Sequence, residues 1–510
     1  MATVSQYGLL RGLRGIRRGR NLEIKPYGIS GVQQTRPDLA EPTSDPDFTY
    51  DAGLDVKWGV TSSLTLDATL NTDFAQVEAD AAQINLTRFS LFFPEQREFF
   101  LERAGLFAHG SSRVTQTFFS RRIGLTESIL AGARLTGQLG PVSLGLLNIE
   151  SGPELDDVLG TASSNNTVAR VRADLPVGFG DARTTVGGIV TNLARAEGTN
   201  TAAGLDAQVR FGQNSEIEAW VTQVWDTAGP ESSAGQVSGQ LASDRLGVFG
   251  SLSIVGRDYD PALGFVRRRD YRRLGGGTFL RQPFDDGPLG LRELYSDVDA
   301  SAYWGLDGGL QSSEVEWEAS VETANEDGFG AGVRHVFERL DEAFSIREDE
   351  VVPVGDYGFV QGFFFAETDG RRPVYGDAGL QVGGFFSGRR VDANVEIGWR
   401  ASPGLRLEAE VEHSVLDLGN GPFTATVSSL SIATALSRDL FGRTLVQYDN
   451  FSKQLRANVR VNWIHTPGSD LFVVFDTAYG LGEDDPLDPR RSVVLRDRVA
   501  IVKLTYLVLI

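Results

Sequence analysis

The sequence predicts an all-β fold, a transmembrane outer-membrane β-barrel of about 24 antiparallel strands with an inward-folded loop or plug. Three observations predict it: apolar and polar residues alternate along most of the chain, no helical repeat of comparable length competes with this alternation, and short turns alternate with longer loops. Glycine is abundant, with 59 residues in 510, while proline contributes only 19. This composition excludes a collagen-like repeat and a disordered proline-rich chain.

Charge and residue content exclude several classes of function. Acidic residues number 68 against 48 basic ones, a net charge of −20, which argues against nucleic-acid binding because neutralising phosphates requires a basic face. The chain has no cysteine, so disulfide scaffolds, thiolate zinc sites, iron–sulfur clusters and cysteine nucleophiles are excluded. The four histidines are scattered, so a histidine-rich metal site is not expected. The sequence therefore predicts no cofactor.

Long apolar helices are not predicted anywhere in the sequence. Residues 1–20 lack the apolar core of a secretory signal, and we expect them to form a periplasmic N-terminal segment before a barrel over 21–510. A membrane-spanning helix needs roughly 20 mostly apolar residues. The nearest candidate, 418–437, is charge-free but repeatedly interrupted by serine and threonine, so it is predicted as strand.

The alternation has a period of two, which is typical of strands with two different faces. In 405–411 the odd positions are leucine, leucine, alanine and valine, while the even positions are arginine and two glutamates. The same pattern is found at 54–58, 64–70, 314–322, 392–399, 455–463 and 502–510.

Two architectures produce such a pattern, a soluble sandwich or propeller and an outer-membrane barrel. The predicted strands run about 10–14 residues, longer than the globular mode and suited to crossing a bilayer at a tilt. Their polar faces carry dense glutamate and arginine, which suits a wet lumen. Aromatic residues fall near strand ends, where an interfacial girdle places them, at Trp58, Trp304, Trp399 and Trp463. These features favour the membrane barrel.

Turn and loop spacing gives the strand number. The count is about 24 if 75–126 is a single outward excursion, and about 26 if 115–123 and a partner are also strands. Both counts are even and place both termini in the periplasm, as in bacterial single-chain barrels. Barrels of this width leave a channel unless something fills it, so we expect a structure inside the lumen.

One long passage breaks the alternation, and we predict that 75–113 folds inward as a plug or constriction. The alternative is a loop whose aromatic residues seal only a small core of their own. Asp73, Glu78 and Asp80 are a weak calcium possibility, because hard cations bind clustered carboxylates, but their spacing lacks the EF-hand layout. The predicted plug residues are Asp73, Glu78, Asp80, Arg88, Phe92, Phe93, Glu95, Arg97, Glu98 and Glu102.

A second candidate site is basic. We expect these arginines to line the lumen and pair with its carboxylates, or else to contact anionic lipid or substrate. The members of this predicted cluster are Arg121, Arg122, Arg267, Arg268, Arg269 and Arg272.

Closely spaced carboxylates on one strand are compatible with an enzyme site or with a hydrated lumen wall. Glu408, Glu410 and Glu412 are spaced so that neighbours on one strand face lie about 7 Å apart, within the range that glycosidases use. Because this spacing recurs on many strands, a hydrated lumen wall explains it better. No serine has the strand–turn–helix context of a nucleophile elbow, and the glycine run at 275–279 lacks the lysine of a phosphate loop. The sequence therefore predicts no enzyme and no catalytic residue.

The passage NTDFAQVEADAAQINLTRFSLFFPEQREFFLE, residues 71–102, resembles the hallmark of the domain-of-unknown-function 5916 family of bacterial outer-membrane β-barrel proteins. Further blocks of the resemblance are SRRIGL (120–125), DYDPALGFVRRRDYR (258–272), FERLDEAF (337–344), GDYGF (355–359) and the run at 447–475. The resemblance implies the outer membrane and an N-terminal domain like carbohydrate-binding family 9. That domain and a signal peptide are absent from this sequence, so we expect it to be the barrel portion. The family supplies no established reaction or cargo.

Two functions remain open from the sequence. The first is a plugged or gated channel or transporter for a polar solute, with saccharide suggested by the family's additional domain. The alternative is a structural or assembly barrel that anchors a periplasmic domain or partner proteins. Expected partners are outer-membrane lipid, lipopolysaccharide and periplasmic or outer-membrane proteins, with no nucleic acid.

Overall fold

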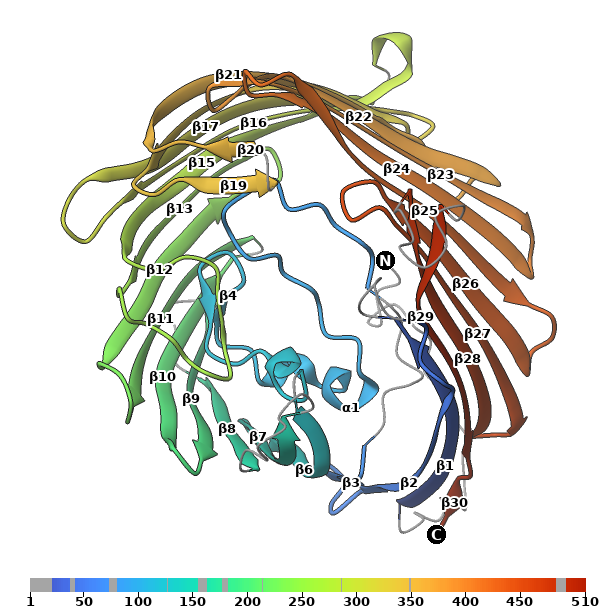
Figure 1. The fold of residues 1–510 in the computed structure, drawn as a ribbon. Helices are drawn as coiled ribbons and strands as arrows, with labels where there is room; N and C mark the ends of the chain where they lie inside the picture. The colour runs from blue at the N-terminus through green and yellow to red at the C-terminus, as the bar shows by residue number, and fades with distance from the viewer. Residues whose placement is uncertain are drawn as a thin grey trace.

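The computed structural model describes residues 21–510 except 37–41, 73–79, 126, 155–162, 177–181, 213, 286, 348–349 and 483–491. Twenty-four long strands form one closed antiparallel barrel. The ring closes because β1 (Leu22–Thr35) pairs on one side with β2 (Asp47–Trp58) and on the other with β29 (Val493–Thr505). Closure leaves no free sheet edge, as a membrane requires. Figure 1 shows the ring of strands and its interior.

The other barrel strands follow one another around the ring in chain order. They are β3 (Leu64–Leu70), β6 (Glu127–Leu139), β7 (Val142–Glu154), β8 (Ser164–Leu175), β9 (Arg183–Arg195), β10 (Gly198–Phe211), β11 (Ser215–Asp226), β12 (Ser232–Ala242), β13 (Leu246–Val255), β15 (Tyr271–Pro283), β16 (Leu291–Trp304), β17 (Leu310–Thr323), β18 (Gly328–Leu340), β21 (Gly355–Glu367), β22 (Val374–Phe385), β23 (Gly388–Ser402), β24 (Leu405–Asp417), β25 (Pro422–Ala435), β26 (Leu440–Asp449), β27 (Gln454–Thr466) and β28 (Ser469–Leu481). The short β30 (Val508–Leu509) continues the last strand and pairs with β1.

The predicted fold and the count of 24 strands are confirmed, and the alternative count of 26 is wrong. The region 115–123 contributes no strand to the barrel wall. Its only strand, β5 (Thr115–Gln116), pairs with β4 (Gly110–Ser111) and β14 (Phe265–Val266) in a separate small sheet. The backbone of β5 pairs with a neighbouring loop rather than with a wall strand, which sequence spacing alone does not reveal.

The apolar face of the strands points outward. Leu205 of β10 and Leu252 of β13 are 66% and 61% exposed, and the same holds for one face of nearly every described strand. Such an apolar outer surface would be unfavourable in water and is typical of lipid contact. The soluble sandwich or propeller is therefore the wrong alternative. No helix in the described part of the chain is long and apolar enough to span a membrane.

The two ends of the barrel differ in their connections. The first residue of β1 and the last residue of β30 lie at the barrel end that has short turns, such as 140–141, 403–404 and 467–468. We term this the short-turn end and the other the long-loop end, although the latter also has two-residue connections at 196–197 and 386–387. Trp58, Trp399 and Trp463 point outward near the short-turn end, where an interfacial belt is expected.

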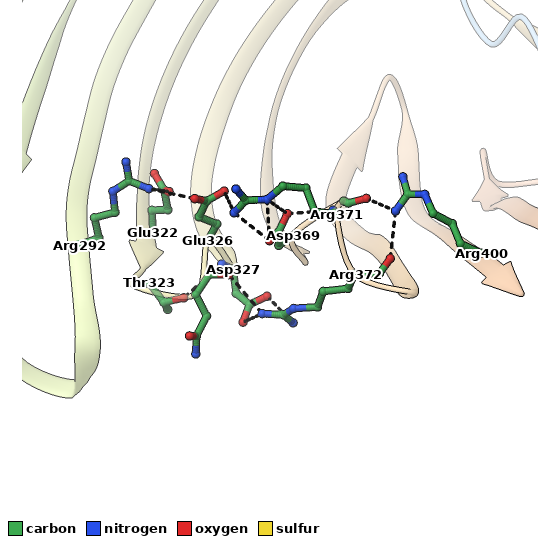
Figure 2. Close-up of polar contacts among 11 residues, drawn as sticks. Arg292, Glu322, Thr323, Glu326, Asp327, Asp369, Arg371, Arg372 and Arg400 are labelled. Carbon is green, nitrogen blue, oxygen red and sulfur yellow. Dashed lines mark hydrogen bonds and ion pairs between the residues drawn. The ribbon is translucent and has the colours of Figure 1, made fainter. Parts of the chain in front are cut away.

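A network of ion pairs lies along the short-turn rim (Figure 2). Arg371 bonds Glu326 from the neighbouring turn and, at 3.0 Å, Asp369 within its own turn. The bond from Arg371 lowers the pKa of Asp369. Further members of the network are Arg292, Glu322, Asp327, Arg372 and Arg400. Because these groups are largely exposed and neutralise one another, they position the turns and contribute little to stability.

Candidate functional site in the barrel lumen

The chain between β3 and β6 runs inside the ring (Figure 1). We term residues 80–125 of this connection the inner segment. It contains α1 (Glu98–Leu101), η2 (Ala104–Leu106), β4, β5 and η3 (Ser120–Arg122). The predicted plug range, 75–113, overlaps it, but 75–79 lie outside the described residues, as do Asp73 and Glu78. Segments of this length that fold back into a structure are usually functional.

One half of the inner segment, residues 97–125, is held to the wall by apolar packing. Phe100, Phe107 and Ile123 are at most 5% exposed and belong to one cluster with inward-facing wall residues. Burying each such side chain contributes roughly 1.5–3 kcal/mol. The wall residues of this cluster are Ile129, Leu147, Ile149, Val168 and Ile189. This packing fixes residues 97–125 to β6–β9, and we term these residues the fixed half.

A buried ion pair between Glu95 and Arg97 orders the chain at the start of the same half. The Glu95 carboxylate accepts bonds from Arg97 Nε at 2.8 Å and from the Ser120 hydroxyl at 2.6 Å. Arg97 Nη1 in turn donates to the carbonyl oxygen of Ile123 at 2.6 Å. Burial alone would raise the pKa of Glu95, but its bonds to Arg97 and Ser120 outweigh burial and lower it. Glu95 is therefore a carboxylate at neutral pH, and it ties the start of α1 to η3.

The wall supplies a second anchor that sequence reasoning missed. Arg134 of β6, 2% exposed, bonds Asp67 of β3 at 2.8 Å and the carbonyl oxygen of Glu102 at 2.8 Å. Its guanidinium also donates to the carbonyl of Phe99. Lys57 of β2 donates to the Glu102 carboxylate at 2.7 Å. Burial opposes the charged form of Glu102, yet its bond to Lys57 lowers the pKa.

The other part of the inner segment, residues 80–94, forms a loop without regular structure, which we term the crossing loop. Arg121 clamps its base, since Nη1 donates to Asp80 at 2.9 Å and to the carbonyl oxygen of Pro94 at 2.7 Å. The same guanidinium lies over the ring of Phe93. The loop leaves and returns at this clamp, and its middle extends across the lumen toward the opposite wall (Figure 1).

The tip of the crossing loop contacts β18. Arg88 Nη2 bonds Glu338 at 2.9 Å, and Leu86 is 6% exposed within an apolar cluster that includes Leu340. The hairpin of β19 (Phe344–Arg347) and β20 (Glu350–Val352) packs into this cluster as well. The tip is thus attached by Arg88, which also donates to the carbonyl oxygen of Arg339 at 3.4 Å, and by the apolar side chains of Ile84 and Leu86. The Phe89 ring lies against the guanidinium of Arg268.

The loop 256–270 folds inward and clasps the inner segment. Its strand β14 pairs with β5, and the carbonyl oxygen of Leu263 accepts a bond from the Phe119 amide at 2.7 Å. Phe265 lies 5.2 Å from Phe92 and 5.6 Å from Phe119, ring centre to ring centre. A loop that connects two barrel strands therefore also holds the inner segment from the long-loop end.

The predicted basic cluster divides in the structure. Arg122 donates to the carbonyl oxygen of Gly264 at 3.1 Å, and Arg269 pairs with Asp260 at 2.6 Å within the clasping loop. Arg272 lies on the outward face of β15, opposite Trp304 in register, so its predicted place in the lumen is wrong. The reason is strand parity, which turns alternate residues outward. Arg121, Arg267 and Arg268 lie in the lumen.

The remaining predicted plug residues give little support for calcium. Both oxygens of Asp80 are engaged by Arg121, and one also by Gln96 at 3.0 Å. Within the described ranges, no group of three metal-ligating side chains gathers. Glu98 is exposed on α1 and forms no ion pair with a described residue.

His109 is a buried polar residue of the inner segment to which sequence reasoning assigned no role. Its Nδ1 lies 2.9 Å from the Thr117 hydroxyl, and its Nε2 lies 3.9 Å from Asp206 of β10. Asp206 is itself paired with Arg170 of β8 at 2.5 Å. Burial and the nearby Arg170 outweigh Asp206 and lower the pKa of His109 to about 4. The ring is therefore neutral at pH 7.

A large part of the lumen wall is acidic. Asp297 and Asp299 of β16 face Glu318 and Glu316 of β17 directly in register. In the described part of the chain, Glu316 pairs with Arg334, while the other three form no ion pair. A similar inward row, Glu408, Glu410 and Glu412, lies on β24, where Glu408 pairs with Arg406 and the other two form no ion pair with a described residue. The wall from β16 to β24 is thus rich in uncompensated negative charge.

The blocks that carry the family resemblance meet in this region. The block at 71–102 supplies the crossing loop, 120–125 supplies its clamp, and 258–272 supplies the clasping loop. The block at 337–344 contains Glu338 and Leu340, which hold the tip. Segments far apart in the sequence therefore converge on one structure inside the barrel.

Comparison with known proteins gives one family and several distant structures. The family model "Domain of unknown function (DUF5916)" matches residues 20–136. No curated protein matches the chain. The siderophore receptor PirA from Pseudomonas aeruginosa is 10% identical with a TM-score of 0.45, covering 97% of this chain and 82% of that chain. The ferric yersiniabactin uptake receptor FyuA from Yersinia pestis is 11% identical with a TM-score of 0.41, covering 95% and 80%. The copper transporter OprC is 11% identical with a TM-score of 0.46, covering 75% and 78%.

These structural similarities are too low to carry over what those proteins bind. The family match is more informative, because it spans β1 to β3, the inner segment and most of β6. Over residues 20–136 the chain therefore matches the DUF5916 family of unknown function, and the resemblance predicted from its sequence is confirmed.

Proposed function

We propose that the chain is a gated outer-membrane channel whose lumen is closed by the crossing loop. The observation that carries the proposal is the unequal attachment of the inner segment. Residues 97–125 are packed on the wall through a buried apolar cluster, whereas the crossing loop is held by a polar clamp at its base, by Arg88 and two apolar side chains at its tip, and by ring contacts to the clasping loop. Displacing the loop therefore breaks contacts of the loop alone and leaves the buried cluster of residues 97–125 in place.

Cationic and neutral polar solutes are the proposed cargo. The carboxylates on β16, β17 and β24 create a negative potential along one side of the lumen, and rings or rows of carboxylates favour cations in channels. The saccharide suggested by the family resemblance stays a prediction. The proposal includes no catalytic step and no bound cofactor.

The proposed orientation has the short-turn end and both termini in the periplasm, because bacterial barrels have short periplasmic turns and longer outer loops. The long-loop end, with its clasping loop, then faces the lipopolysaccharide leaflet and the medium. The chain lacks cysteine, so single cysteines introduced in the turns at 305–309 and 60–63 would test this with a membrane-impermeant maleimide on intact cells. Only the former should be labelled.

Planar-bilayer recording tests the channel function. We expect the intact chain to stay closed for most of the time, and a variant with 80–94 replaced by a short glycine–serine linker to conduct continuously with cation preference in a salt gradient. A barrel that conducts equally with and without the crossing loop would contradict the proposal.

A second candidate function is an anchoring barrel with a permanently closed lumen. The three apolar clusters that pack wall, inner segment and clasping loop together favour it. In that case the linker variant would conduct, but no change that loosens only the tip would produce openings, and periplasmic or outer-membrane proteins would co-purify with the intact chain.

A further inference from the structure

A cavity of about 230 Å³ lies at the long-loop end of the lumen, between the tip of the crossing loop and β15–β18. Phe89 lines it from the crossing loop, and Arg113 lines it from the fixed half. Arg267 and Arg268 reach it from the clasping loop, which joins β13 to β15. Four separate parts of the chain therefore line one cavity.

The cavity has an excess of positive charge. Arg113 and Arg267 form no ion pair with any described residue, and Arg268 donates only to neutral oxygens, of Ser312 at 2.7 Å and Gln311 at 2.8 Å. Burial and the neighbouring Arg88 lower the pKa of Arg268, and the nearby Glu338 acts in the opposite direction.

Two carboxylates also line the cavity, but each is already bound to another arginine. Glu338 pairs with Arg88 at 2.9 Å, and Glu314 pairs at 3.2 Å with Arg334, which also pairs with Glu316. Three guanidinium groups are therefore left without a carboxylate partner. Arg113 and Arg267 are exposed, whereas Arg268 is half-buried, and a half-buried arginine without a counter-ion is a costly arrangement unless a ligand supplies the missing charge.

Aromatic rings give the cavity flat walls. The Arg268 guanidinium lies 4.5 Å from the ring centre of Tyr303 and 5.4 Å from that of Phe89. Tyr271 packs against Tyr303 with ring centres 5.1 Å apart. Planar guanidinium groups bind carboxylates through two parallel hydrogen bonds, and aromatic faces stack on flat apolar groups. A ligand that carries both a carboxylate and a flat apolar ring would therefore match the arginines and the aromatic side chains.

We propose that this cavity binds a small organic anion, an aromatic monocarboxylate. Its volume corresponds to roughly eight waters, about the space of one ring that carries a carboxylate. The carboxylate is placed between Arg267 and Arg268, and the ring against Phe89 and Tyr303. This inference concerns binding alone and does not depend on conduction, so its test and that of the channel are independent.

Isothermal titration calorimetry on the detergent-solubilised full chain tests the site with benzoate as the probe. We expect saturable benzoate binding that weakens at least ten-fold in Arg267→Gln/Arg268→Gln. Arg210→Gln/Arg245→Gln removes the same charge near the short-turn end and should leave the affinity unchanged. Arg113→Gln should also weaken benzoate binding. Because Arg113 is exposed, this variant should fold normally, and it therefore tests the site even if the double variant fails to fold.

Two further probes define the ligand class. Benzyl alcohol keeps the ring without the charge, and inorganic phosphate keeps the charge without the ring, so both should bind at least ten-fold more weakly than benzoate. No benzoate binding, equal binding in Arg267→Gln/Arg268→Gln, or equal binding of benzyl alcohol would overturn the site. Phosphate binding as tight as benzoate would overturn the aromatic class.

Discussion

Arg88 and Glu338 form an ion pair of 2.9 Å that joins the tip of the crossing loop to β18. The inner segment starts and ends at β3 and β6, and β18 lies on the opposite side of the ring (Figure 1). Both side chains are about one-quarter exposed, so this pair is screened less than a surface pair. Together with the bond from Arg88 Nη1 to the carbonyl oxygen of Arg339 at 3.4 Å, this pair holds the tip of the loop at β18.

Arg88→Gln should raise the open probability of the channel. Removing an ion pair worth about 1 kcal/mol changes the ratio of open to closed states roughly five-fold. Single-channel recording measures this ratio directly. Arg371→Gln, which removes an equal charge from the exposed rim network, is the matched control and should gate as the unmodified chain does. Equal open probabilities in the two variants would contradict the role of the pair.

Glu95→Gln should loosen the contact between α1 and η3. The buried Arg97 keeps its bonds to backbone carbonyls but loses its charged partner, which should lower the local opening free energy by about 1–3 kcal/mol. Hydrogen exchange at the amides of 120–123 reports this opening. Glu98→Gln, an exposed carboxylate three residues away, should leave exchange unchanged. Identical exchange in both variants would show that the pair does not order this region.

His109 should make stability depend on pH. Its pKa falls from 6.5 to about 4 in the folded chain, so the unfolded state takes up a proton first as the pH falls. The stabilising contribution is complete above pH 6.5 and is lost progressively toward pH 4. Between pH 7.5 and pH 5 the loss amounts to about 2 kcal/mol.

Urea unfolding in lipid vesicles at these two pH values measures the effect. His109→Asn should remove most of the difference. Glu95 does not interfere, because a carboxylate with a lowered pKa keeps its contribution above its ordinary value of 4.5. A difference between the two pH values that persists unchanged in His109→Asn would assign the pH dependence to other groups.

Leu252→Arg should destabilise the barrel because Leu252 points into lipid. An arginine on the lipid face near the bilayer centre costs about 2–4 kcal/mol. Ser238→Arg, on the lumen side of the adjacent β12, should cost much less. Unfolding midpoints in vesicles give both values. A reversed order would mean that the strand faces have been assigned to the wrong sides.

Period-two alternation made the barrel predictable, because each strand shows one face to lipid and one to the lumen. In the seven residues from Leu405 to Val411, apolar side chains alternate with charged ones, and the turns between such segments give the number of strands. The alternation also locates the inner segment as the place where it stops. Fold, strand count and the position of the anomaly were therefore accessible from local pattern.

The interior contacts were not accessible in this way. Glu338 looks like any other lumen carboxylate in the sequence, and only the curvature of the ring brings it to Arg88. Arg134 carries no signal beyond its parity, although it anchors the fixed half. The prediction that Arg272 faces the lumen is wrong because the start of β15 at Tyr271 cannot be located within a run of arginines. From Tyr271 onward, successive side chains alternate between the lumen and the outer face.

Tethering the tip of the crossing loop tests its role as a gate most directly. In this cysteine-free chain, Arg88→Cys/Glu338→Cys can be bridged by a short bis-maleimide or capped singly with N-ethylmaleimide. The account predicts frequent openings in the capped protein, which lacks the ion pair, and a channel that stays closed at every voltage in the bridged protein. Equal conductance in the bridged and capped proteins would contradict it.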